Sequence, residues 1–365
     1  MNFRILYLIF VSIFLIVNCH VDKKLDNPSL VVRKVDCTKS EYRISNLCED
    51  EKEYLDWANK IKKHPRLKDL TADVLHSYTQ ETLDVDKSAS LFYLRAIQEP
   101  NNQKFLNYLD KKEKELEKKL PNYSKKKILL AMVPGMFYKD NPSVGADGKM
   151  LRDIALELGM LEDLIPIEQT GTVDENAKII CDYTKNKSME VNGIVFASVS
   201  KGSGDLKKAI QLCGKEPYFK KVKGWYNIGG LNRGSRLIEG IENNWRYRWE
   251  AKFYFWMKNY NYDGFLSMRS EPGAPLDFDL ELPKDLLMIN IIAVPQFRQV
   301  TERARPFYEF LIRFGPNDGM TLLAESYVEG AITYPSWRND HYFQWPILHS
   351  RMQAFLVYIV ENQFR

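Results

Sequence analysis

An apolar run that ends in a serine between small residues constrains this chain more than any other segment. Residues 193–202 read Gly-Ile-Val-Phe-Ala-Ser-Val-Ser-Lys-Gly, a pattern typical of a buried strand that leads into a helix. Ser198 and Gly202 stand two positions before and after Ser200. Only small side chains fit at these positions in a sharp strand-to-helix turn, because the turn crowds them. The segment therefore predicts a nucleophile elbow that presents the hydroxyl of Ser200.

Two polar turns downstream hold the partners that a nucleophilic serine needs. A histidine must accept the serine proton, and a carboxylate must orient that histidine. Asp318 lies in an Asn-Asp-Gly turn after an apolar run, and His341 follows in the polar turn of residues 339–341. His349 is the rival histidine, on an expected helix over residues 345–361, since the other three all lie before residue 77. Asp340 is adjacent to His341 and cannot easily reach its ring.

Together these three segments resemble the α/β-hydrolase superfamily, particularly its lipase- and esterase-like members. In that family an Asn-Asp-Gly turn carries the acid and an Asp-His or Gly-His turn the base, both after the serine. The resemblance covers residues 127–365 and departs from the family pattern at Ser198, where glycine is usual. It implies an α/β-hydrolase fold and a serine hydrolase that cleaves carboxylic esters, possibly of lipids, without a cofactor. Ser200 would be the nucleophile, Asp318 the acid and His341 the base.

The same resemblance locates an oxyanion hole. One donor is the backbone N–H that follows the nucleophile, here that of Lys201, and the second comes from the loop after an early central strand. The expected strand covers residues 128–133, and its loop begins Pro-Gly where many relatives have His-Gly. The second donor is therefore expected at Met136 or Phe137. A plain strand-to-loop turn is the alternative.

The amino terminus reads as a targeting segment. Arg4 precedes an apolar stretch over residues 5–17, which has the length of a signal peptide and is short for a membrane span. The following Leu-Ile-Val-Asn-Cys resembles the lipobox of bacterial lipoproteins. We expect residues 1–18 to be removed and Cys19 to carry a lipid that holds the exported protein on a membrane of the cell envelope. An uncleaved anchor or ordinary secretion is the alternative.

The character of the sequence changes near residue 122. Residues 19–121 are polar and mix apolar and charged side chains at helical spacing, which predicts a helical extension after the lipidated terminus. Residues 122–365 alternate apolar strands with helices, as in a mostly parallel sheet covered on both faces. Strands are expected over residues 128–133, 164–168, 193–198, 223–228 and 286–294, and helices over residues 149–158, 174–185 and 203–213.

An insertion dense in aromatic residues is expected within the hydrolase domain, over residues 230–283. Hydrolases of this superfamily commonly carry a lid at this place, and an aromatic lid would form an apolar acyl pocket and exclude water. Packing of the same rings onto the main domain is the alternative. Arg233 could meet an anionic group, although surface arginines are more common. The aromatic residues are Trp245, Tyr247, Trp249, Phe253, Tyr254, Phe255, Trp256, Tyr260, Tyr262 and Phe265.

Charge and cysteine content exclude some classes of function. A net charge of +4 over 365 residues gives no argument for nucleic-acid binding. Cys37 and Cys48 bracket a short polar segment, so a local disulfide is plausible in an oxidising compartment. Cys181 and Cys213 could form a second bridge, and two unpaired buried cysteines are at least as compatible with the sequence. No Cys-x-x-Cys or His-Glu-x-x-His spacing supports a metal site.

Two interpretations from other classes compete with an esterase. A nucleotide-binding oxidoreductase is suggested by Gly202 and Gly204 after a strand, but the third glycine position is Lys207 and the next strand lacks a carboxylate for a ribose. A catalytically inactive hydrolase fold, used by a lipoprotein as a surface binding protein, stays open.

Overall fold

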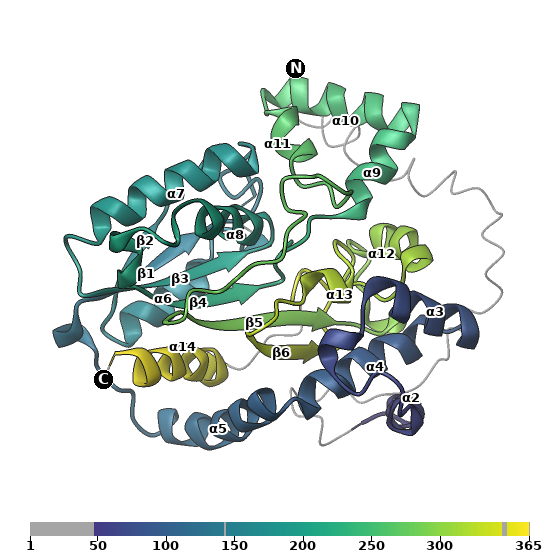
Figure 1. Cartoon of the computed structure of the whole chain (residues 1–365), viewed down its shortest axis with the longest axis horizontal. Coiled ribbons are helices and arrows are strands. Elements are labelled where there is room, and N and C mark those ends of the chain that lie inside the picture. The colour runs from purple at the N-terminus through teal and green to yellow at the C-terminus, as the bar shows by residue number, and fades with distance from the viewer. Residues whose placement is uncertain (1–46, 142–143, 345–348, 365) are drawn as a thin grey trace.

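The computed structural model describes residues 47–141, 144–344 and 349–364 (Figure 1). Its centre is one six-stranded sheet in the order β2-β1-β3-β4-β5-β6, in which all neighbouring strands are parallel. The strands are β1 (Ile128–Val133), β2 (Leu161–Leu164), β3 (Gly193–Val199), β4 (Val222–Ile228), β5 (Leu287–Val294) and β6 (Ile332–Trp337).

Helices cover both faces of the sheet, so the central strands are largely apolar, and β1 is apolar throughout. Every residue of β1 is buried, and its side chains alternate between two cores. Leu130 packs against one helical layer, whereas Leu129 packs against the other. The first layer contains α6 (Lys149–Glu157) and α14 (His349–Gln363), and the second contains α7 (Val173–Lys187) and α8 (Lys201–Cys213).

Four N-terminal helices pack around the β6 edge of the sheet and the α14 layer (Figure 1). The carboxylate of Glu51 accepts hydrogen bonds from Arg338 Nε at 2.7 Å and Nη2 at 2.6 Å, directly after β6. Burial acts to raise the pKa of Glu51, but the hydrogen bonds and the positive charge of Arg338 outweigh it and lower that pKa. The helices are α2 (Glu49–Lys60), α3 (Ala72–Thr82), α4 (Val85–Gln98) and α5 (Pro100–Leu116).

The insertion after β4 projects from one end of the molecule, at the top of Figure 1. It contains α9 (Arg236–Asn243), α10 (Trp245–Lys258) and α11 (Tyr262–Leu266). Two short helices, α12 (Arg305–Leu311) and α13 (Leu323–Ser326), lie between β5 and β6. Single-turn 3₁₀ helices are η2 (Leu67–Asp69), η3 (Ser124–Lys126), η5 (Pro217–Lys221), η6 (Phe297–Gln299) and η7 (Ile312–Phe314).

The expected class of fold is confirmed: the chain has one parallel sheet flanked by helices on both faces, with a helical N-terminal region. Two details differ from expectation. β2 covers Leu161–Leu164, earlier than residues 164–168, and β6 was not expected. Cys181 and Cys213 form a disulfide between α7 and α8, with their Cα atoms 6.1 Å apart, so the alternative of two unpaired cysteines is wrong.

Residues 1–46 lie outside the described residues, and with them the expected signal peptide, Cys19 and Cys37. Lipidation at Cys19 and a bridge between Cys37 and Cys48 therefore stay predictions, as do the domain boundaries. Within the described residues, every helix is too short or too polar to cross a membrane.

Candidate active site

Ser200 occupies the turn between β3 and α8 in a strained conformation. Its backbone has φ 51° and ψ −123°, a combination that residues with a side chain rarely adopt. Neighbouring backbone holds it there: Ser200 N–H donates to the carbonyl of Ile228 at 3.2 Å, and the Ser200 carbonyl accepts from Leu231 N–H at 3.2 Å. The strain is therefore fixed on both sides of the serine, as a nucleophile elbow requires.

Gly202 lets α8 begin directly against the loop after β1. A Cβ atom at Gly202 would lie 2.4 Å from the carbonyl oxygen of Pro134 and 2.5 Å from that of Val133. Backbone atoms cannot yield as a flexible side chain would, so any larger residue would push the helix away from this loop. The small residue expected after the serine is thus required by packing.

Ser198, two residues before Ser200, is buried in a polar network. Its hydroxyl accepts a hydrogen bond from Trp225 Nε1 at 2.7 Å and donates to Asn227 Oδ1 at 3.0 Å. Asn227 Nδ2 donates to Asn290 Oδ1 at 2.8 Å, and Asn290 Nδ2 donates to the Ser326 carbonyl at 2.9 Å. The network provides hydrogen-bond partners for the buried hydroxyl of Ser198 and links β3, β4 and β5 below the elbow. Asparagine inside an apolar strand was the sequence signal for it, since strands are depleted in this residue.

The structure brings Ser200, His341 and Asp318 into one hydrogen-bonded row. His341 Nε2 lies 3.0 Å from Ser200 Oγ, and His341 Nδ1 lies 2.8 Å from Asp318 Oδ2. The other carboxylate oxygen, Asp318 Oδ1, accepts from the N–H groups of Met320 at 2.8 Å and Thr321 at 2.9 Å. Since an ionised carboxylate only accepts hydrogen bonds, Nδ1 carries the proton of the neutral ring and Nε2 faces the serine with its lone pair.

Backbone contacts and burial fix the acid and the histidine relative to each other. His341 N–H donates to the Asp318 carbonyl at 2.8 Å, so the two turns are paired through main chain as well as side chain. The side chain of Asp318 is 1% exposed and that of His341 7%. Their hydrogen bond is thereby protected from competition with bulk water.

The rival residues lie in other environments. Asp340 Oδ2 accepts from the Thr301 N–H at 2.8 Å and from its hydroxyl at 2.7 Å, away from the ring of His341. His349 begins α14 and places Nε2 2.7 Å from Glu157 Oε2 in an exposed pair. Neither residue contacts Ser200.

Both expected oxyanion-donor regions lie beside the elbow. Lys201 opens α8, where the first amides of a helix have no acceptor within the helix and carry its positive dipole end. Across from it, Gly135 approaches the carbonyl of Val199, and its own N–H is already bonded to Ala146 at 2.8 Å. The following N–H groups have no acceptor among the described residues, which leaves two candidate donors. They are those of Met136 and Phe137.

The side chain of Lys201 serves structure, in contrast to its backbone. It is buried and donates to both carboxylate oxygens of Asp205, at 2.7 and 2.8 Å. Asn176 Nδ2 donates to the same carboxylate at 2.8 Å. Burial raises the pKa of Asp205, and the two donors oppose that rise. This buried pair, which sequence reasoning missed, ties α8 to α7 behind the elbow.

The aromatic insertion covers the candidate oxyanion loop with one of its faces. Phe255 is buried, and its ring centroid lies 5.9 Å from that of Phe137. Tyr260 also stacks near Phe137, with centroids 5.0 Å apart. Of the six other rings of α10, four are exposed and two tyrosines are half-buried, so packing of the rings onto the main domain, the alternative to a lid, holds for the inner face alone. Arg233 forms an ion pair with Asp279, and an anion would have to compete for it.

Lys207 joins α8 to the beginning and the end of the insertion. Its buried ammonium donates to the carbonyls of Asn232 and Leu276 at 2.8 Å each and to that of Phe278 at 2.5 Å. Burial lowers its pKa to about 7. Lys207, which stands where a nucleotide-binding loop would have its third glycine, thus connects α8 to the insertion.

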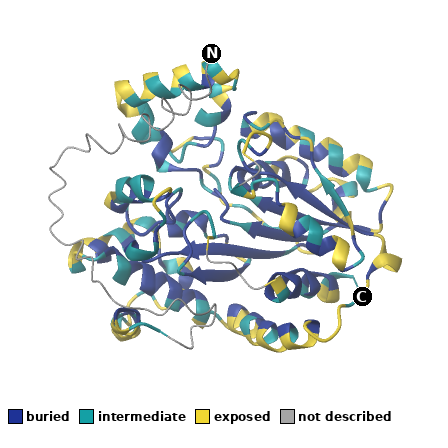
Figure 2. Cartoon of the chain, turned by 180° about the vertical axis from the view of Figure 1, so that it is seen from behind, coloured by how far each residue is buried: buried dark blue, intermediate teal, exposed yellow. Residues whose placement is uncertain are grey.

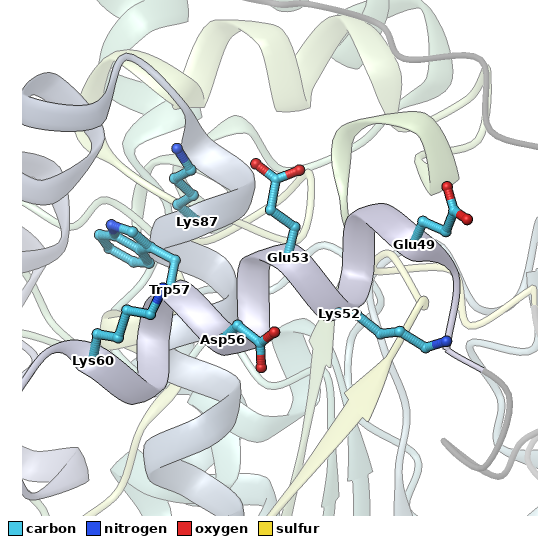
Figure 3. A pocket seen from close by; sticks show the side chains of 7 residues that line it. All are labelled: Glu49, Lys52, Glu53, Asp56, Trp57, Lys60 and Lys87. Carbon is cyan, nitrogen blue, oxygen red and sulfur yellow. The ribbon is translucent and has the colours of Figure 1, made fainter.

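A separate surface hollow lies on the N-terminal helices and offers no comparable chemistry (Figure 3). Acidic and basic side chains alternate around it, without a serine, cysteine or histidine. Among the described residues there is also no group of three or more histidine, cysteine, aspartate or glutamate side chains that could hold a metal ion. The hollow is lined by Glu49, Lys52, Glu53, Asp56, Trp57, Lys60 and Lys87.

No protein-family model matches this chain, and neither does any curated protein. Among solved structures, a metagenomic carboxyl esterase is similar at 18% identity with a TM-score of 0.49, over 65% of this chain and 76% of the esterase. The mature form of a Bacillus licheniformis lipase is similar at 16% identity with a TM-score of 0.47, over 66% of this chain and 92% of the lipase. The propeptide form of the same lipase is similar at 16% identity with a TM-score of 0.48, over 68% of this chain and 52% of that form.

Proposed function

We propose that this protein is a serine hydrolase that cleaves carboxylic esters through an acyl-enzyme on Ser200. The observation that carries the proposal is the row Asp318, His341 and Ser200, assembled at a strained strand-to-helix turn. His341 is 141 residues from Ser200 and 23 residues from Asp318 in the sequence, yet its two ring nitrogens lie within hydrogen-bond distance of both side chains, as proton transfer requires. A surface binding protein would have no need of this alignment, which favours the enzyme over the inactive lipoprotein.

The proposed reaction is acyl transfer to water. His341 Nε2 takes the proton of Ser200 as its oxygen attacks the ester carbonyl, and Asp318 stabilises the imidazolium that forms. The protonated ring then gives its proton to the departing alcohol. A water molecule, deprotonated in turn by His341, attacks the acyl-enzyme and releases the acid together with free Ser200.

The oxyanion of each tetrahedral intermediate would lie between the elbow and the loop after β1. Its donors are the Lys201 N–H and that of Met136 or Phe137, which are held by backbone geometry before substrate arrives. Removing one such donor typically lowers kcat by about a hundredfold to a thousandfold. This arrangement needs no cofactor.

The ester would be apolar, a class that includes lipid esters, because the insertion beside the oxyanion loop is rich in aromatic rings. We also keep export and membrane attachment through a lipid on Cys19 as a proposal. It would be tested by fatty-acid labelling, which Cys19→Ser should abolish and which would refute lipidation at this residue if it persisted.

Hydrolysis of short 4-nitrophenyl esters tests the catalytic proposal. Ser200→Ala and His341→Ala should each lower kcat/KM at least about a hundredfold while the protein stays folded. Ser77→Ala and His349→Ala change exposed residues of the same types and should leave it unchanged. A folded Ser200→Ala variant with more than about a hundredth of the parent rate would contradict the assignment.

A further inference from the structure

The outer face of α10 carries a continuous strip of exposed aromatic rings. Trp245 is 76% exposed, Trp249 63%, Phe253 40% and Trp256 75%. Their spacing of four, four and three residues puts them on one side of the helix. The rings of Trp249 and Phe253 stack with centroids 5.4 Å apart, and those of Phe253 and Trp256 lie 5.7 Å apart.

Packing among the residues that the structure describes does not account for the strip. The inner face of α10 already supplies the contact with the rest of the molecule through the buried Phe255, whose five aromatic neighbours all lie outside the strip. The outer side of the helix faces solvent (Figure 2). Soluble proteins rarely expose a contiguous aromatic surface unless it binds something.

Basic residues border the strip on both sides. Helical geometry places Arg246 along one edge and Arg248 and Lys252 along the other, and all three are exposed. The only acidic residue of α10, Glu250, is paired with Arg246 at 3.0 Å. The face therefore combines large rings with a surplus of positive charge.

We propose that this face of α10 docks onto a phospholipid surface that bears anionic headgroups. Tryptophan rings settle at the boundary between headgroups and acyl chains, and nearby lysine and arginine side chains are attracted to anionic lipids. A helix of 14 residues is about 21 Å long, shorter than the roughly 30 Å apolar core of a bilayer, so α10 would lie in the surface.

A second copy of this chain is a poorer occupant. A symmetric contact through the strip would bring the bordering arginines and lysine of two molecules together, and like charges repel at short distance. An anionic lipid surface complements the same charges. The inference goes beyond the proposed esterase, because docking requires no residue of the Ser200 row.

Fluorescence quenching by brominated phospholipid tests the proposal on the full-length protein. The parent for this experiment carries Ser200→Ala, so that substrate turnover plays no part, and the vesicles contain phosphatidylcholine and phosphatidylglycerol. Tryptophan fluorescence should be quenched with these vesicles and far less with phosphatidylcholine alone. The triple change Trp245→Ala, Trp249→Ala and Trp256→Ala should remove the vesicle-dependent quenching and weaken binding roughly tenfold or more.

Two controls keep the outcomes distinct. Trp57→Ala removes a tryptophan from α2, at the other end of the molecule, and should keep the quenching of the parent (Figures 1 and 2). The triple variant with Ser200 restored should still hydrolyse a short soluble ester like wild type. Sedimentation with vesicles without quenching, or quenching that survives the triple change, would overturn the proposal. So would a dimer that the triple change dissociates without any vesicle-dependent quenching.

Discussion

The N-terminal helices and the insertion reach the same candidate site by different means. On one side, α2 inserts the carboxylate of Glu51 against Arg338, three residues before His341. On the other side, α10 places the ring of Phe255 against Phe137 in the candidate oxyanion loop. Charged hydrogen bonds thus support the segment that carries His341, whereas ring contacts support the candidate oxyanion loop.

The difference suggests unequal rigidity at the two sides of the site. Bidentate hydrogen bonds between a carboxylate and a guanidinium fix both distance and direction. Ring contacts at centroid distances of 5 to 6 Å are less directional, and they allow small shifts without loss of contact. We expect a substitution in the Glu51–Arg338 pair to destabilise the whole fold. We expect a substitution among the rings of the insertion to be accommodated by local shifts.

Loss of the buried carboxylate on α2 should have the largest effect on the free energy of unfolding. Glu51→Ala would leave the guanidinium of Arg338 and the indole N–H of Trp337 without their shared acceptor. Breaking such a buried pair costs about 3–5 kcal/mol of unfolding free energy. Urea unfolding would measure it, with the exposed Lys52→Ala on the same helix as control. A loss below about 1 kcal/mol, the range of an exposed pair, would remove the contrast between the two regions.

Truncation of the inner ring of α10 should affect activity more than global stability. Phe255→Ala empties an aromatic cluster and should cost about 3 kcal/mol in the insertion. Because Phe137 then loses a neighbour, we expect kcat/KM for a short ester to fall about tenfold. Hydrogen exchange should show the opening confined to residues near α9–α11. Equal loss of protection from hydrogen exchange across the central sheet would show that the insertion does not unfold separately from the rest of the protein.

A second carboxyl of the N-terminal region, that of the half-buried Asp86, should make stability depend on pH. Burial raises the pKa of Asp86 to about 7, although its Oδ1 accepts the N–H of Phe297. The folded state thus keeps a proton that the unfolded state releases near pH 4, so stability falls as pH rises from about 4 to 7. Asp86→Asn should remove this slope and gain a few kcal/mol of unfolding free energy at pH 8, at about 1.4 kcal/mol for each unit of the pKa shift. The exposed Asp73→Asn should keep the slope, and a slope that is unchanged in Asp86→Asn would assign it to another group.

The outer rings of α10 should contribute least to stability. Trp249→Ala removes an exposed side chain and should change the unfolding free energy by less than about 0.5 kcal/mol. Thermal unfolding in the absence of lipid would measure this. A loss comparable to that of Phe255→Ala would mean that the strip packs within the protein and is not available for docking.

Much of the sheet and of the Ser200–His341–Asp318 row was predictable because the signals are local. The apolar runs of β1, β3, β4 and β5 lie within a residue or two of their expected bounds. β6 escaped prediction because Pro335 stands in its interior, and proline lacks the N–H that a central strand needs. The structure shows why it is tolerated: β6 is at the edge of the sheet.

Buried polar side chains could not be placed from sequence in the same way. Lys201 and Lys207 read as ordinary charged residues of a helix, yet both are buried in the folded chain. Lys201 pairs with Asp205 one turn along the same helix, and Lys207 donates to a carbonyl of the distant insertion. Likewise Glu51 finds Arg338 only because α2 folds back on the end of β6. Such contacts depend on tertiary packing, which local periodicity does not encode.

Labelling with a fluorophosphonate probe, followed by mass spectrometry of the modified peptide, tests the central claim most directly. The probe reacts with a serine only where a base activates it. We predict that the wild-type protein is labelled at Ser200, that Ser200→Ala is not labelled, and that His341→Ala is labelled at least about a hundred times more slowly. A folded wild-type protein that resists the probe, or that carries it on another residue, would contradict the account.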